Sequence, residues 1–173
     1  APQRDLYKAM QGVGVQEWPD IFHTLTTVRR LSLHHGALLL VSNAGTSNSG
    51  GGGLHCIVLG VLKQVDNLRS AVARNALLTL GDLFQGLGRG MDQEVAFALP
   101  FVLKRFGDSS TFLVDSAERA LQQMMDNVSP SRSLIGLLIA TDHRTAIVRG
   151  KVASLIYILW SQKLKELKGY CVV

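Results

Sequence analysis

The stretch that decides the fold lies in the middle of the chain, where residues 67–90 read NLRSAVARNALLTLGDLFQGLGRG. Its apolar residues recur every three or four positions, at Leu68, Val72, Ala76, Leu80 and Leu83. This spacing predicts one apolar stripe along a helix, because side chains three or four apart share a helical face. The glycines at 86, 88 and 90 are typical of a helix end.

The same periodicity recurs on both sides of this stretch. A second stripe comprises Phe112, Ala117, Ala120, Leu121 and Met124, and a third comprises Val148, Val152, Leu155, Ile156 and Leu159. Sustained alternation of the kind that predicts strands is absent from the sequence. The pattern predicts eight helices. Pro19 and Pro130 are expected at helix starts, and Pro100 is expected to kink its helix or to free one carbonyl. The helices are expected near residues 5–11, 20–35, 54–66, 68–87, 92–106, 111–127, 131–140 and 145–167.

The predicted helices fall into pairs joined by very short turns, at 66–67, 108–110 and 142–144. The second helices of three pairs start 44 and 36 residues apart, at Leu68, Phe112 and Val148. Such recurrence is typical of HEAT or armadillo repeats. We therefore expect one all-α domain over residues 1–173, a HEAT-repeat α-solenoid with about four helix pairs. The segment SNAGTSNSGGGG at 42–53 is interpreted as a loop insertion or an engineered linker.

Composition limits the partners and the compartment. Hydrophobic residues make up 47% of the 173 residues, charged residues only 18%, and the net charge is +5. A basic surface suits an acidic partner, although a modest excess of solvated charge is an equal alternative. Two distant cysteines make neither a disulfide framework nor a zinc site, and Cys56, in an apolar run, is predicted to be in the core. We expect a reduced, intracellular setting and no membrane span.

Nothing in the sequence indicates catalysis or a cofactor. The glycines at 51–53 and 86–90 follow no strand and precede no Gly-Lys-Ser/Thr, so we interpret them as a linker and a helix stop. The adjacent His34 and His35 lack the spacing of three or four that metal binding on a helix needs. The basic residues at 163–168 are interpreted as a solvated helix face, and no nucleic-acid binding is predicted. No nucleophile, base and orienting group come together, so we expect no enzyme.

Several segments resemble the TOG domains of the crescerin family, the TOG-array regulators of axonemal microtubules. The resemblance covers residues 16–160, with the related TOG domains of cytoplasmic-linker-associated proteins as the nearest alternative. It rests on the order and spacing of NLRS at 67–70, LGRGMDQE at 87–94, FGDSSTFLVDSAERALQQM at 106–124, VSPSRSLIGLL at 128–138 and DHRTAIVRGKVASL at 142–155.

The resemblance implies a flat paddle of HEAT repeats, in which the turns within each pair line one edge that grips αβ-tubulin or the microtubule lattice. It implies a protein of the cytoplasm, cytoskeleton and cilium, possible binding to another ciliary protein, and no cofactor. Carried over by position, the tubulin-facing candidates are Trp18, Asn67, Arg69, Ser70, Ser110, Thr111, His143 and Arg144.

Two of these candidates also have a purely structural interpretation. Trp18 is equally a staple between the first two helices, and Arg69 is alternatively the partner of an acid in a neighbouring repeat. Arg149 lies inside its helix and is assigned to structure. Asp20 and Thr111 stand where the family often has basic residues. The second hypothesis is therefore a TOG-fold interaction scaffold that has lost tubulin binding.

Overall fold

Helices make up nearly all of the chain that the computed structural model describes, which is residues 17–41 and 53–170. No strand occurs within these residues, and the all-α prediction is confirmed. The α-helices are α2 (Trp18–Val41), α3 (Gly53–Val65), α4 (Ser70–Leu87), α5 (Val95–Lys104), α6 (Thr111–Asn127), α7 (Pro130–Ile139) and α8 (Ala146–Tyr170). Short 3-10 turns follow three of them, η1 (Gly88–Met91), η2 (Arg105–Gly107) and η3 (Ala140–Asp142).

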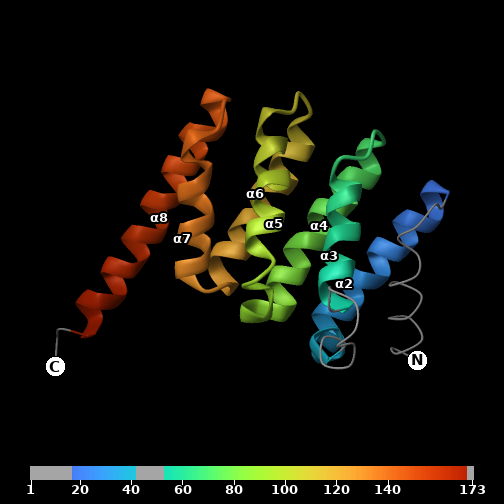
Figure 1. Cartoon of the computed structure of the whole chain (residues 1–173), viewed down its shortest axis with the longest axis horizontal. Coiled ribbons are helices and arrows are strands. Elements are labelled where there is room, and N and C mark those ends of the chain that lie inside the picture. Colours follow the sequence, from blue (N-terminus) through green and yellow to red (C-terminus); the bar gives the residue numbers. More distant parts are fainter. Residues whose placement is uncertain (1–16, 42–52, 171–173) are drawn as a thin grey trace.

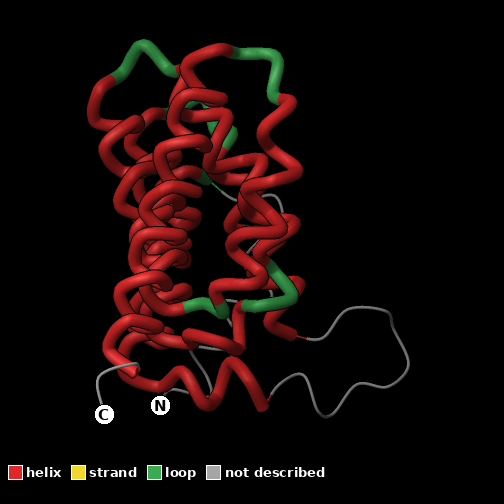
Figure 2. The backbone as a smooth tube through the Cα atoms, turned by 90° about the vertical axis from the view of Figure 1, so that its left-hand side faces the viewer, coloured by secondary structure: helices red, strands yellow, loops and turns green. Residues whose placement is uncertain are grey.

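The helices stand side by side in two layers (Figures 1 and 2). α4 packs against α2 and α6 within one layer and against α3 across the layers. α5 contacts α3 and α7 in the second layer, and α8 packs on α7. This arrangement of antiparallel pairs in a row is the predicted HEAT-type solenoid.

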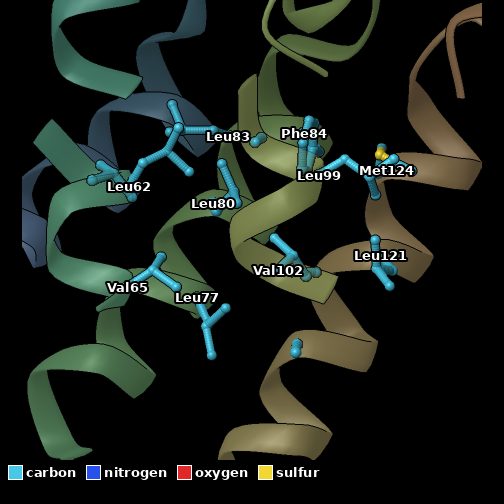
Figure 3. Packing of buried hydrophobic residues seen from close by; sticks show 14 of the residues in the cluster. Leu62, Val65, Leu77, Leu80, Leu83, Phe84, Leu99, Val102, Leu121 and Met124 are labelled. Atoms are coloured by element: carbon cyan, nitrogen blue, oxygen red, sulfur yellow. The ribbon is translucent and has the colours of Figure 1, made fainter. Parts of the chain in front are cut away.

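The core lies between the layers and is centred on α4 (Figure 3). Val72, Ala76, Leu80 and Leu83 are fully buried, as the central stripe predicts. In Figure 3 the side chains of α4 lie among those of α3, α5 and α6, and the labelled residues show this interleaving. The stripes of α6 and α8 are also confirmed apart from Phe112, which is discussed next.

Three residues predicted for the core lie at the surface instead. Leu68 is 102% exposed, because α4 begins only at Ser70 and the leucine precedes it in the turn. Phe112 is 41% exposed at the start of α6. Cys56 is exposed because α3 turns its buried face toward Ile57 and Val58 and not toward residue 56. The apolar run around Cys56 therefore belongs to a helix with one solvent-exposed face, and that face contains Cys56.

The second predicted helix is longer than expected. The predicted span 20–35 is part of α2, which continues to Val41 across a break at His35, where φ is −141° and ψ is 36°. The break lies beside a close crossing of α2 and α4. A Cβ atom at Gly36 would lie 3.0 Å from the Gly86 carbonyl oxygen, so both positions need glycine for the two backbones to approach.

Other boundaries shift by a few residues. The predicted fifth helix, 92–106, is the shorter α5 with 3-10 turns on both sides. Pro100 lies inside α5 and leaves one carbonyl of the preceding turn without its helical donor, as expected. Pro130 is the first residue of α7. The predicted helix at 5–11 and residues 42–52 of the glycine-rich segment lie outside the described residues.

A polar seam that the periodicity did not reveal joins α2 to α4. Asp82 is almost fully buried, and its Oδ2 accepts a 2.6 Å hydrogen bond from Arg29 Nε. About two helical turns away, Asn75 Nδ2 donates to the Phe22 carbonyl at 3.1 Å. Between them, Thr79 Oγ1 donates to the Asn75 carbonyl at 2.7 Å. Because each of these polar groups has a hydrogen-bond partner, the seam holds α2 and α4 in register without the free-energy cost of an unpaired buried group.

Candidate functional site

The turns within the helix pairs lie along one edge of the molecule, the upper edge in Figure 1. We call this the turn edge, and it comprises residues 17–20, 66–70, 108–112 and 142–147. It arises because each pair is antiparallel, so α3, α5 and α7 all end where α4, α6 and α8 begin. The structure thus brings the four predicted turns into one row.

The first two turns touch through an aromatic and a basic side chain. Arg69 places its guanidinium carbon 5.2 Å from the centre of the Trp18 ring. Such a cation–π contact at an exposed site contributes roughly 0.5–1 kcal/mol. The ring remains 45% exposed. Arg69 therefore meets Trp18 of the adjacent turn, where the structural interpretation expected an acid.

Asn67 shapes the second turn from within. Its Oδ1 accepts a 2.9 Å bond from the Arg69 backbone N–H, and its Nδ2 donates 2.8 Å to Gln64 Oε1. This is an Asx turn, which sets the chain direction just before Ser70 opens α4. Its geometry leaves the Leu68 side chain entirely in solvent.

The third turn is clamped to the second by Arg105. The guanidinium donates from Nε to the Val65 carbonyl at 3.0 Å, where α3 ends, and from Nη1 to Asp108 Oδ2 at 2.8 Å. A cation suits the last carbonyls of a helix. Lys104 Nζ lies 2.9 Å from Asp66 Oδ2 on the same side. Arg105 is thus largely buried in internal bonds, whereas Lys104 forms an exposed ion pair.

Asp108 orders the start of α6. Its Oδ1 accepts a 3.1 Å bond from the Ser110 backbone N–H. This bond, supported by the Arg105 guanidinium, holds the pKa of Asp108 below its ordinary value of 3.8. Ser110 is the N-cap residue and Thr111 the first residue of α6, and Thr111 is exposed.

The fourth turn is held by a residue from inside α8. Arg149 Nη1 donates to the carbonyls of His143 at 2.9 Å and Arg144 at 3.1 Å, which confirms its structural assignment. His143 Nδ1 accepts from the Thr145 backbone N–H at 3.2 Å. Arg144 is exposed, and its side chain makes no hydrogen bond or ion pair in the part of the chain that the structure describes.

Each turn carries an exposed apolar side chain, which the sequence interpretation anticipated at Trp18 and missed at the other three turns. The four apolar tips and their exposed fractions are Trp18 (45%), Leu68 (102%), Phe112 (41%) and Ile147 (66%). Each lies within two residues of the start of the second helix of its pair. Their place at the helix start was the available signal, but the apolar periodicity assigned Leu68 and Phe112 to the core stripes.

The recognition chemistry of the turn edge is consequently more apolar than basic. Lys104 and Arg105 are engaged by the α3 terminus, and Arg69 lies over Trp18. Exposed apolar side chains at the centre of a contact are the usual anchors of protein interfaces, with arginine beside them. The row of four tips with Arg144 is suited to hold another protein.

Neither a metal centre nor a phosphate loop emerges in the described residues. No group of three or more His, Cys, Asp or Glu lies close enough to hold a metal ion within them. Gly86 and Gly88 have structural roles, because Gly86 packs on α2 and Gly88 ends α4 with a φ of +51°. Among the described helices, none combines the length and the hydropathy that crossing a bilayer requires.

Known families provide an independent comparison. The family described as CLASP N terminal matches residues 47–168, about two thirds of the chain. The mouse protein "TOG array regulator of axonemal microtubules protein 1" (Mus musculus) is 34% identical over 137 residues, which cover 79% of this chain and 7% of that protein. The "Crescerin-like protein che-12" of Caenorhabditis elegans is 27% identical over 103 residues, 58% of this chain and 8% of that protein.

A solved structure, the "Crystal Structure of MAST/Orbit N-terminal domain", superposes with a TM-score of 0.61 at 17% identity. The match covers 89% of this chain and 65% of that one. At this identity the likeness concerns the fold, and it agrees with the solenoid described above. The chain spans less than a tenth of the length of the curated relatives it matches.

Proposed function

This chain belongs to the CLASP N-terminal family of TOG-type domains, and from that premise we propose that it binds αβ-tubulin or the microtubule lattice through its turn edge. The observation that carries the proposal is the row of four apolar tips along that edge. The name of the mouse relative, which refers to axonemal microtubules, supports a cytoskeletal role and motivates the ciliary setting that we also propose.

The proposed mechanism is docking of a pre-formed surface. The Asx turn at Asn67, the Arg105 clamp and the Arg149 bonds order the turns before any partner arrives. Little conformational entropy remains to be lost on binding, and this preorganisation favours affinity. Trp18 with Arg69 forms one composite anchor, and Leu68 projects beside it.

We assign contact roles to the tips and support roles to several predicted residues. Arg144 is the free cation that steers toward an acidic partner such as tubulin. Ser70, Ser110, Thr111 and His143 lie on the turn edge and complete its polar rim. Asn67 acts through the turn that it shapes. No step in this proposal needs a cofactor or catalysis.

Gel filtration with free αβ-tubulin at micromolar concentration tests the proposal. The native chain is expected to co-migrate with tubulin, and Trp18→Ala and Arg69→Ala are each expected to weaken co-migration, since loss of a central aromatic or arginine anchor costs about 2 kcal/mol or more. Unchanged co-migration of both variants would refute this assignment of the anchors.

A second candidate has its own observation. Asp20 and Thr111 stand where the family often has basic residues, Arg105 is bonded to the end of α3, and Lys104 is paired with Asp66. This favours a TOG-fold scaffold that holds a different, less acidic protein, such as another ciliary component. Absence of any shift of the native chain with tubulin would favour this candidate. In either case we propose that residues 1–173 act as one domain with a loop or linker at 42–53.

A further inference from the structure

A groove between α5 and α7 adjoins the turn edge at the fourth turn. It has a volume of about 250 Å³. Leu99, Leu103 and Gly136 form its buried floor, and exposed Ala96, Pro100 and Ile139 form its walls. The remaining lining residues are Ala140, Asp142 and His143, where the groove meets the fourth turn.

Two of the lining residues, Gly136 and Pro100, shape the groove through their effect on the helices. Gly136 has no side chain, and a Cβ there would lie 2.9 Å from Leu99 Cδ2, so the helices approach closely at the floor. Pro100 leaves a carbonyl of the preceding turn of α5 without its helical donor on the same side. The outer faces of α5 and α7 add exposed apolar side chains: Phe97 (49%), Ile135 (54%), Leu138 (51%) and Ile139 (74%).

Opposite charges lie along this side of the molecule: Arg132 one helical turn of α7 beyond the lining residues, and Asp142 within the lining at the other end. Arg132 is exposed one helical turn before Gly136 on α7, and it makes no ion pair within the described residues. Asp142 is exposed and lines the other end. Ten residues separate the two, which at 1.5 Å per helical residue is about 15 Å. A complementary segment therefore carries an acidic group at one end and a basic group at the other.

We propose that this groove binds a short amphipathic segment of a partner protein. One bulky apolar side chain of the segment fills the pocket, an acidic side chain pairs with Arg132, and a basic one pairs with Asp142. The volume favours a single anchor side chain, since pockets for small-molecule ligands usually measure roughly 300–1,000 Å³. Apolar anchors in such grooves are a common mode of helical peptide recognition. The proposal does not rest on tubulin binding.

A labelled peptide provides the direct test. The probe is a fluorescein-labelled helical peptide of twelve residues, with glutamates at one end, a central tryptophan and lysines at the other end. Fluorescence anisotropy with the native chain is expected to show saturable binding with a Kd on the order of micromolar. The same peptide with alanine for tryptophan is expected to bind at least about tenfold more weakly.

Variants of the chain locate the binding. Ala96→Trp fills the groove from an exposed wall, and Arg132→Glu reverses the charge beyond one end, so each is expected to weaken binding at least about tenfold. Leu33→Ser removes an exposed apolar side chain from α2, away from the groove, and should leave the affinity unchanged. Absence of saturable binding by the native chain, or equal affinity in Ala96→Trp, overturns the proposal. Circular dichroism verifies that each variant is folded.

Discussion

Gly86 is a position where one methyl group tests the packing of α2 on α4. A Cβ there would lie 2.1 Å from the Ser32 carbonyl oxygen and 2.6 Å from its carbonyl carbon. These are backbone atoms, so no change of rotamer relieves the clash, and the helices must separate by roughly 1 Å. Overpacking of this kind costs typically about 1–3 kcal/mol, and a backbone clash belongs at the upper end.

Helix propensity acts in the opposite direction. Alanine is favoured over glycine in a helix by up to about 1 kcal/mol. Gly86→Ala is therefore expected to lower the free energy of unfolding by a net value of about 2 kcal/mol. The matched control is Gly150→Ala in α8, where an added Cβ meets nothing within 4 Å, and it should raise the free energy of unfolding by about 1 kcal/mol.

Urea unfolding followed by circular dichroism at 222 nm measures both effects. A shift of the midpoint at constant m-value reports a change of stability without a change in the surface exposed on unfolding. A Gly86→Ala protein as stable as the native chain would refute the close crossing of α2 and α4. A loss of stability in Gly150→Ala would show that the propensity argument does not hold in α8.

Three further substitutions, with Glu118→Ala as a control for the first, test separate parts of the structure. Asp82→Ala leaves the partly buried Arg29 with only its 3.4 Å bond to Asn75 Oδ1 and should lower the unfolding free energy by about 2 kcal/mol, whereas Glu118→Ala, which breaks an exposed pair, should cost less than about 1 kcal/mol in the same urea experiment. Gly88→Ala forces a side chain into a backbone with φ +51° and should cost about 1–3 kcal/mol; a neutral result would contradict the assigned cap. Because the folded-state pKa of Asp108 is lowered, its contribution to stability is present above the unfolded pKa, near 3.8, and is lost as pH falls through the folded pKa. Asp108→Asn should thus be less stable than the native chain at pH 7 and nearly equal to it at pH 2, and a difference that stays constant with pH would contradict this.

The spacing of apolar residues predicted most of the helices, because the buried residues of this chain recur with the period of an α-helix. The stripe at Val72, Ala76 and Leu80 is both regular and fully buried. The turn residues were equally informative, since Asp108 and Asn67 each bond the backbone two residues ahead. Local chemistry of this kind can be predicted from sequence because the partners are neighbours in the chain.

The errors arose where spacing alone does not distinguish a core residue from a surface one. Leu68 continues the stripe of α4 by its number, yet the helix starts two residues later and leaves the leucine in the turn. The length of α2 was underestimated because His35 interrupts its backbone geometry while the chain continues beyond it. The Asx turn decides the first outcome, and the close crossing of α2 and α4 beside His35 accompanies the second.

The sequence predicted that the turns share one edge but not the side chains exposed there, and the assignment of that edge as a binding site stays a prediction. The four turns do form one edge, and Trp18 and Arg69 do lie together there. Pairings such as Arg105 with the end of α3 join residues 40 apart, so the sequence could not show that much of the positive charge is used internally. The apolar tips then remain as the main exposed chemistry of the turn edge.

The central claim is that these tips bind the partner, and one measurement tests it most directly. Gel filtration of Leu68→Ser with αβ-tubulin, beside the native chain and the control Leu33→Ser, compares two exposed leucines, one on the turn edge and one on α2. Serine at the fully exposed Leu68 should not affect folding. The native chain and Leu33→Ser are predicted to co-migrate with tubulin, while Leu68→Ser is predicted to lose most of that co-migration. Equal behaviour of the three proteins, whether all bind or none does, would contradict the account.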